Sequence, residues 1–240
     1  MLAYALTLFL SAFLLFLVEP LIGKFILPWH GGTPAVWTTC MLVFQVLLLG
    51  GYAYAHGLSS RLKPRSQAIV HGVLLVAALA CLPITPSDSW KPTGEWAPAL
   101  HIVLLLLACL GLPFLVLSAT GPLMQAWLGT THPGRSPYRL YALSNAGSFL
   151  ALLAYPFCVE WLLGRSQQTL VWSASYVVFA VFCGFCAWRL WRSGACIRED
   201  SSGTVGEIPS EPDRGADEKL GIMRVAAWFL LPALASARSE

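Results

Sequence analysis

The chain has 240 residues, of which 57% are hydrophobic and only 11% are charged. An ordinary soluble domain carries about a quarter charged residues, so this composition excludes a soluble protein of the usual kind. The net charge of +3 has no basic cluster with interleaved aromatic residues behind it, so we expect no nucleic-acid partner.

Long runs without a charged residue predict helices that cross a lipid bilayer. A charge at the bilayer centre costs at least a few kcal/mol, and one span needs roughly 20 apolar residues of helix. The runs show no apolar/polar alternation, which argues against strands. We expect six helices, near Leu2–Leu27, Pro34–Gly57, Ser66–Leu82, Pro98–Trp127, Tyr138–Val159 and Gln168–Trp191. The predicted fold class is therefore all-α, a polytopic transmembrane helix bundle over residues 1–191.

The first expected helix carries two charges, Glu19 and Lys24, beside Pro20. Proline removes a backbone hydrogen bond and disfavours helical geometry at the residue before it, so we expect a break that exposes carbonyl groups near the carboxylate. Broken helices with charges build substrate sites in many transporters. The alternative is that both charges lie near the outer headgroups and snorkel or pair with each other. Met1–Val18 has no basic n-region, which disfavours a cleaved signal peptide.

The second expected helix has a polar stripe on one face. Its members are Thr38, Met41, Gln45, Tyr52 and His56. Gln45 falls at mid-helix, where it contacts a ligand or bonds across to another helix. His56, near the cytoplasmic end, is either a proton-linked group or a polar helix end.

Two later helices also carry polar residues. Gly121 and Pro122 predict a bend in the fourth, with Gln125 just beyond it. The fifth has a stripe of small and polar residues that favours close helix packing, namely Tyr141, Ser144, Asn145, Ser148, Ala151 and Tyr155. Asn145 is the member that we single out as a binding candidate.

Glu160 follows the fifth helix, near its expected outer end. It falls at the same depth as Glu19, so we hypothesise that these two carboxylates and Lys24 line one outward-facing vestibule.

Metal and catalytic chemistry are not indicated. Cys183 and Cys186 form a C-x-x-C, but without a βαβ pattern or a second pair they are interpreted as packing residues. His30, His71, His101 and His132 occur singly and predict no site. No nucleotide-binding glycine motif, metal-ligand cluster or Ser-His-Asp order is present, so we expect no catalytic residue, metal or cofactor, and the chain itself is not expected to be an enzyme.

Charged loops predict the orientation. Lys and Arg gather in the even-numbered loops, with Arg61, Lys63 and Arg65 in the second, whereas the third and fifth hold only Lys91 and Arg165. The positive-inside rule therefore places the amino terminus in the cytoplasm.

Beyond Trp191 the composition changes. Residues 192–221 are expected to form a flexible polar cytoplasmic linker, rich in Ser, Gly, Pro and acidic residues. Residues 222–240 are expected to begin an incomplete seventh hydrophobic helix, too short to span a bilayer, with a short interfacial helix as the alternative. We therefore expect the chain to be a fragment of a longer protein.

Three stretches resemble one known family. They are LVEPLIGKFILPWHGGTPAVWTTCMLVFQVLLLGGYAYAH, LSATGPLMQAW and SPYRLYALSNAGSFLALLAYPFCVEW, with weaker similarity in WFLLPALAS. They are similar to the amino-terminal membrane half of bacterial fused major-facilitator-like/spermidine-synthase-like proteins. The resemblance implies a major-facilitator-like bundle in the bacterial inner membrane, followed by further helices and an aminopropyltransferase-like domain that these residues do not include. Trp161 departs from the family pattern, where a proline after Glu160 would mark the outer break of the fifth helix.

Two functions follow as expectations. The first is the membrane domain of a transporter-like protein for a small polar or cationic solute, related to a polyamine, with Glu19 and Glu160 attracting the cation. The alternative is a membrane anchor that positions a spermidine-synthase-like enzyme and transports nothing. The expected partners are the lipid bilayer and, in the first case, the solute.

Overall fold

The computed structural model describes residues 1–92, 97–131 and 138–200, and helices make up most of these ranges. No strand occurs within them. The expectations for His132, for the polar linker beyond Asp200 and for the further hydrophobic helix concern residues outside these ranges.

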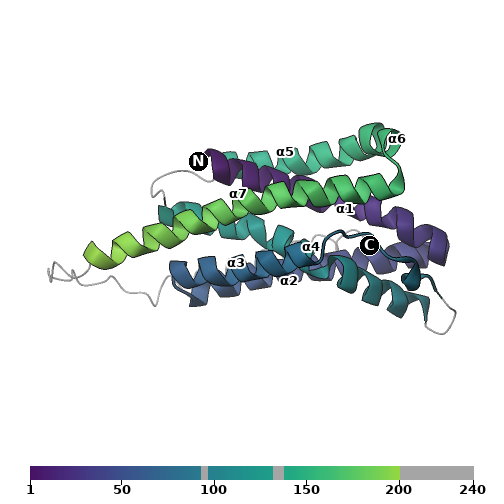
Figure 1. Ribbon diagram of the computed structural model, residues 1–240, viewed down its shortest axis with the longest axis horizontal. Helices are drawn as coiled ribbons and strands as arrows, with labels where there is room; N and C mark the ends of the chain where they lie inside the picture. Colours follow the sequence, from purple (N-terminus) through teal and green to yellow (C-terminus); the bar gives the residue numbers. More distant parts are fainter. Residues whose placement is uncertain (93–96, 132–137, 201–240) are drawn as a thin grey trace, which may run out of the picture. The chain divides into compact units, whose positions relative to one another are not determined.

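Each of the six expected helices is present, and successive long helices run in opposite directions (Figure 1). The long helices are α1 (Leu2–His30), α2 (Pro34–Arg61), α3 (Pro64–Ala80), α4 (Pro98–Thr131), α5 (Tyr138–Ala154) and α7 (Arg165–Asp200). The shorter elements are a 3₁₀ turn η1 (Asp88–Trp90), a π-helical turn η2 (Tyr155–Val159) and α6 (Glu160–Leu162). Proline begins α2, α3 and α4, where its missing N–H would lack a helical partner anyway.

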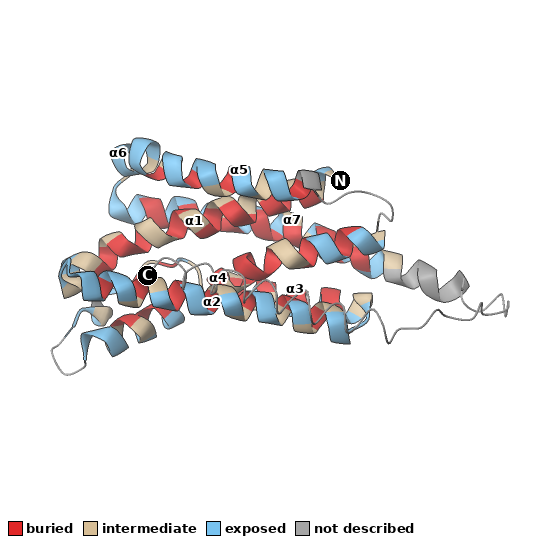
Figure 2. Ribbon diagram, turned by 180° about the vertical axis from the view of Figure 1, so that it is seen from behind, coloured by how far each residue is buried: buried red, intermediate tan, exposed pale blue. Residues whose placement is uncertain are grey.

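Five stretches are long and apolar enough to cross a membrane, which indicates a multi-pass membrane protein. They are Leu2–His30, Pro34–Arg61, Pro98–Thr131, Leu140–Leu162 and Arg165–Ser193. The third expected span, α3, has only 17 residues, so length and composition support five spans and the sixth stays a prediction. Exposed residues lie on the outward faces of the helices (Figure 2). Many of them are large apolar residues, as a lipid environment requires.

Two expectations about helix continuity were wrong. α1 is one helix through both Pro20 and Pro28, without the break predicted at Glu19. Neighbouring helices surround it, and such packing lets membrane helices tolerate the lost backbone bond. At the other end of the bundle, α7 remains helical to Asp200, beyond the boundary expected at Trp191.

Helix α1 is central, packing against α4, α5 and α7, while α2 pairs with α4 and α3 with α7. Small residues set two of these approaches. A Cβ atom added to Gly147 in α5 would lie 2.7 Å from the carbonyl oxygen of Phe9 in α1. A Cβ atom at Gly51 in α2 would collide with the side chain of Ser118 in α4. These contacts fit the role of small residues at membrane helix interfaces.

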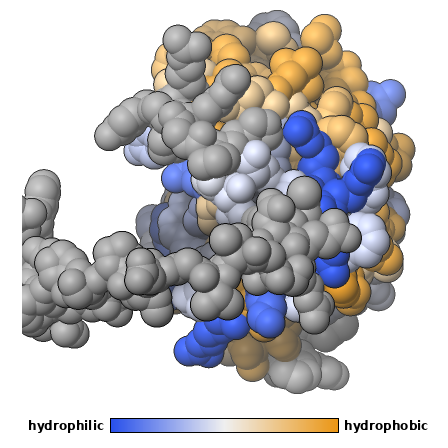
Figure 3. All heavy atoms as spheres, turned by 90° about the vertical axis from the view of Figure 1, so that its left-hand side faces the viewer, coloured by the Kyte–Doolittle hydropathy of each residue, from blue (hydrophilic) through white to orange (hydrophobic). Residues whose placement is uncertain are grey.

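The bundle has two chemically different ends. The basic end is defined by Arg61, Lys63, Arg65, Arg189 and Arg192. Hydrophilic residues gather there, with hydrophobic residues on the flanks (Figure 3). The far end, where α1 ends and α4 begins, is less basic.

Candidate functional site

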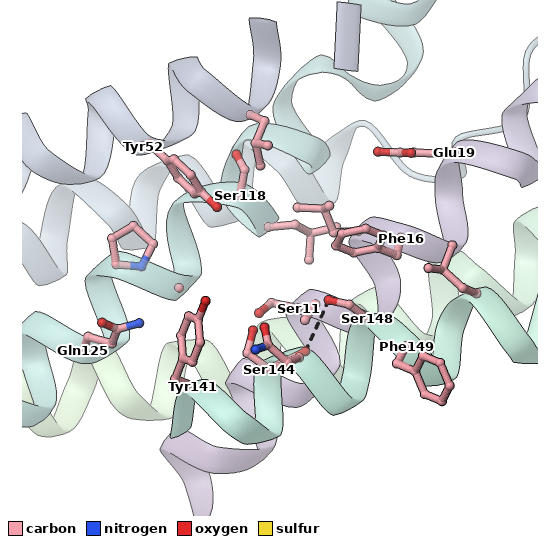
Figure 4. Close-up of a pocket in the computed structure, with 18 of the residues that line it drawn as sticks. Ser11, Phe16, Glu19, Tyr52, Ser118, Gln125, Tyr141, Ser144, Ser148 and Phe149 are labelled. Atoms are coloured by element: carbon pink, nitrogen blue, oxygen red, sulfur yellow. Dashed lines mark hydrogen bonds between the residues drawn. The ribbon is translucent and has the colours of Figure 1, made fainter. Parts of the chain in front are cut away.

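A cavity of about 710 Å³ opens between α1, α2, α4 and α5. This volume lies within the range of small-molecule sites. Its polar lining comprises Ser11, Glu19, Gln45, Tyr52, Ser118, Gln125, Tyr141, Ser144, Asn145 and Ser148. In Figure 4, Tyr52 and Ser118 lie on one side of the cavity, opposite Tyr141, Ser144 and Ser148, and Gln125 lies beside Tyr141. Tyr141 keeps 61% of its surface exposed, so the cavity is open rather than enclosed.

Among the described residues of the lining, Glu19 is the only Asp, Glu, Lys, Arg or His. Its side chain is half-buried and its carboxylate points into the cavity (Figure 4). The ion pair found within the described ranges joins Lys24 to Glu160 and does not include Glu19. The cavity therefore holds a carboxyl group that has no ion-pair partner within these ranges.

Lys24 takes a different partner, Glu160. The Lys24 Nζ atom lies 2.7 Å from Glu160 Oε1 and 5.7 Å from the centre of the Tyr155 ring. The Tyr155 hydroxyl in turn donates a hydrogen bond to the carbonyl oxygen of Pro20, at 3.3 Å. These contacts join α1 to the end of α5, where Pro156 has no N–H to donate and the chain forms the π-helical turn η2.

The expected single vestibule is therefore not present. Lys24 and Glu160 pair with each other and do not line the cavity that holds Glu19. Of the remaining candidates, Gln45 and Asn145 line the cavity with Glu19, so three of the six residues are brought together. His56 is exposed on α2 outside this lining, and its carbonyl oxygen accepts a 2.7 Å hydrogen bond from the Ser60 hydroxyl.

Two serines of the lining had no signal in the sequence. Ser11 and Ser118 lie in strongly apolar helices, and each hydroxyl donates to a carbonyl in its own helix, at 2.9 Å to Leu8 and 3.0 Å to Leu115. This local bond satisfies the hydroxyl proton and leaves the oxygen as an acceptor. Ser144 and Ser148, noted for helix packing, also line the cavity.

A second polar group, which we call the sealed cluster, lies between α2, α3, α4 and α7. Its members are Tyr54, Gln67, His71, Trp127 and Cys183. His71 is 0% exposed, with Nδ1 3.4 Å from the Tyr54 hydroxyl and Nε2 3.5 Å from Cys183 Sγ. Trp127 stacks edge-on to His71 and donates a 2.9 Å hydrogen bond to Gln67 Oε1. His71 is therefore the centre of a contact network, which its isolated position in the sequence did not predict.

Cys183 and Cys186 match their interpretation as packing residues, because both are free and buried. Another cysteine, Cys158 in η2, is free and exposed. Among the described residues, no three His, Cys, Asp or Glu side chains are grouped in a way that could hold a metal ion.

The chemistry available in the cavity is electrostatic attraction and hydrogen bonding. A carboxylate attracts a cation, and amide, hydroxyl and phenol groups can donate or accept hydrogen bonds. Comparison with protein-family models, with curated proteins and with solved structures gave no match to this chain.

Proposed function

We propose that the cavity binds a small polar or cationic solute, such as a polyamine or a related amine, in a transporter-like membrane domain. The observation that carries the proposal is Glu19, a carboxylate on a membrane helix with no cationic partner among the described residues. A charge within a membrane is costly unless a partner or water compensates it. An ammonium group of the solute would supply that partner.

The rest of the lining suits such a solute. Gln45 and Asn145 offer amide oxygens to further N–H groups, and Tyr52 and Tyr141 offer ring faces as well as hydroxyls. Phe16 and Phe149 add apolar surface for methylene groups. A cation with a short hydrocarbon chain matches this mixture better than an anion does, because the described residues of the lining include Glu19 and neither Lys nor Arg.

The cellular setting is part of the same proposal. The basic end is placed in the cytoplasm by the positive-inside rule, which puts the amino terminus there as well. The resemblance to fused major-facilitator-like/spermidine-synthase-like proteins supports a bacterial inner-membrane location and a solute related to polyamines.

The experiment compares two carboxylates on the purified full chain in detergent. Radiolabelled spermidine is the probe, and Glu19→Gln is expected to weaken binding by about 10- to 100-fold, since a hydrogen bond to a charged group contributes roughly 1.5–3 kcal/mol. Glu160→Gln is the matched control, because Glu160 pairs with Lys24 outside the cavity. The affinity of the Glu160→Gln variant for spermidine should equal that of the wild type.

Both variants must first elute from size exclusion like the wild-type chain. Equal spermidine affinity in wild type and Glu19→Gln would contradict the proposal. If replacements at Glu19, Gln45 and Asn145 lowered folding yield and left affinity unchanged, the result would favour a membrane anchor for a synthase-like enzyme.

A further inference from the structure

Two histidines meet at the far end of the bundle. His30 is the last residue of α1, and His101 lies in the first turn of α4. The Nε2 atom of His30 is 3.2 Å from the Nδ1 atom of His101, and the ring centres are 5.1 Å apart with a tilt of 49°. Both side chains are half-buried, so solvent ions can reach them.

The separation of these nitrogens suits a shared metal ion. Zinc–imidazole bonds are about 2.0–2.1 Å long, so two imidazole nitrogens in a tetrahedral site are about 3.3 Å apart. The distance of 3.2 Å between His30 and His101 is close to this value. In the hydrogen-bonded pair the two facing nitrogens point at each other, so each ring would turn by about 35° to aim its lone pair at a shared tetrahedral ion.

We propose that His30 and His101 bind one divalent transition-metal cation, with Zn²⁺ as the reference ion and water in the remaining positions. Without the ion, one neutral imidazole donates its N–H to the other. On binding, the donor ring moves its proton to its far nitrogen, so both facing nitrogens present lone pairs. The neutral pair keeps the same number of protons before and after.

The surroundings define what kind of site this is. The carbonyl groups at the end of α1 favour a cation beside His30, while the amino-terminal end of α4 disfavours one beside His101. The Trp90 ring centre lies 6.0 Å from that of His101. No third His, Cys, Asp or Glu of the described residues joins the pair, so we expect an exchangeable ion rather than a permanently held one.

A bound ion would have a mechanical effect, because it would tie the last turn of α1 to the first turn of α4. Neither histidine lines the cavity, so this site is separate from the one proposed for the solute. Loss of spermidine binding and loss of zinc binding are therefore independent outcomes.

The test uses the full chain in detergent, purified with a tag that contains no histidine. Zinc is titrated by calorimetry into wild type, His30→Gln, His101→Gln and His56→Gln. We expect one zinc site in wild type and in His56→Gln, whose histidine is exposed elsewhere on α2. Either of the other two variants should lose at least about tenfold in affinity, since even an outer-shell partner contributes 10- to 100-fold.

Calorimetry also records any zinc that cysteines bind, so thermal unfolding provides a second measurement. An ion that binds only the folded chain raises its stability with concentration. Zinc should raise the unfolding temperature of wild type and of His56→Gln, but not that of His101→Gln. No saturable zinc binding by wild type, or equal binding and equal thermal shifts in wild type and His101→Gln, would overturn the proposal.

Discussion

The sealed cluster and the cavity both place polar side chains inside the helix bundle, but they satisfy those groups in different ways. In the sealed cluster, His71 and Gln67 find their partners on neighbouring helices. In the cavity, Glu19 faces an open space with no cationic partner among the described residues. Trp127 is 1% exposed, whereas Tyr141 at the cavity is 61% exposed.

This difference teaches how to sort polar residues in a membrane bundle. A buried polar group that neighbouring helices satisfy holds those helices together, and losing one partner leaves the other unsatisfied. A polar group that faces an open cavity can exchange water for a solute. Substitutions in the sealed cluster should therefore change stability, and substitutions in the cavity should change affinity.

The largest expected effect is on the sealed cluster. Trp127→Ala removes a large buried side chain and its hydrogen bond to Gln67, so the free energy of unfolding in detergent should fall by about 3–5 kcal/mol. Trp161→Ala is the control, because Trp161 is 85% exposed, and it should change this free energy by less than about 0.5 kcal/mol. Equal losses in the two variants would remove the distinction between sealed and open regions.

A smaller effect is expected where α5 packs against α1. Gly147→Ala places a Cβ atom against the carbonyl oxygen of Phe9, and the resulting shift should cost about 1–3 kcal/mol of stability. The same substitution at Gly184 in α7 meets no atom within 4 Å and should stabilise the helix by roughly 0.5–1 kcal/mol. Thermal unfolding of the two variants should therefore shift in opposite directions. A shift in the same direction would mean that the α1–α5 contact can relax.

The last comparison separates two amide side chains, Gln67 in the sealed cluster and Asn145 in the cavity. Gln67→Ala should destabilise the chain by about 1–3 kcal/mol, since Gln67 accepts from Trp127 and donates a 2.8 Å hydrogen bond to the carbonyl oxygen of Leu62. Asn145→Ala should leave stability unchanged and weaken spermidine binding by roughly two- to tenfold. Unfolding curves and binding isotherms for both variants check this. If Gln67→Ala weakened spermidine binding and Asn145→Ala lowered stability, the assignment of the two regions would be wrong.

The helices were predictable because a bilayer penalises charge so strongly. Runs without charged residues located all six long helices, with the first residues of α1, α2, α4 and α5 as expected. The helix ends were less predictable. A run without charges predicts where a helix can lie in lipid and not where it ends, and α7 continues past Trp191 into a charged sequence, where Arg and Glu also favour helix.

The candidate site was harder to predict because depth in the membrane does not define direction around a helix. Glu19 and Lys24 are five residues apart, which rotates one side chain about 140° from the other. Glu19 therefore faces the cavity while Lys24 faces Glu160. His30 and His101 are distant in sequence, and only the packing of α1 and α4 brings their rings together.

The most direct test of the comparison measures water access to both regions. Two variants of the full chain are placed in membranes, one with Cys183 as its only cysteine and one with Glu19→Cys as its only cysteine. A charged thiol reagent reacts where water reaches the thiol, and labelling after denaturation shows that both thiols are intact. The account predicts rapid labelling of Glu19→Cys and none of Cys183 in the folded chain. An unlabelled Glu19→Cys, or equal labelling of both, would contradict it.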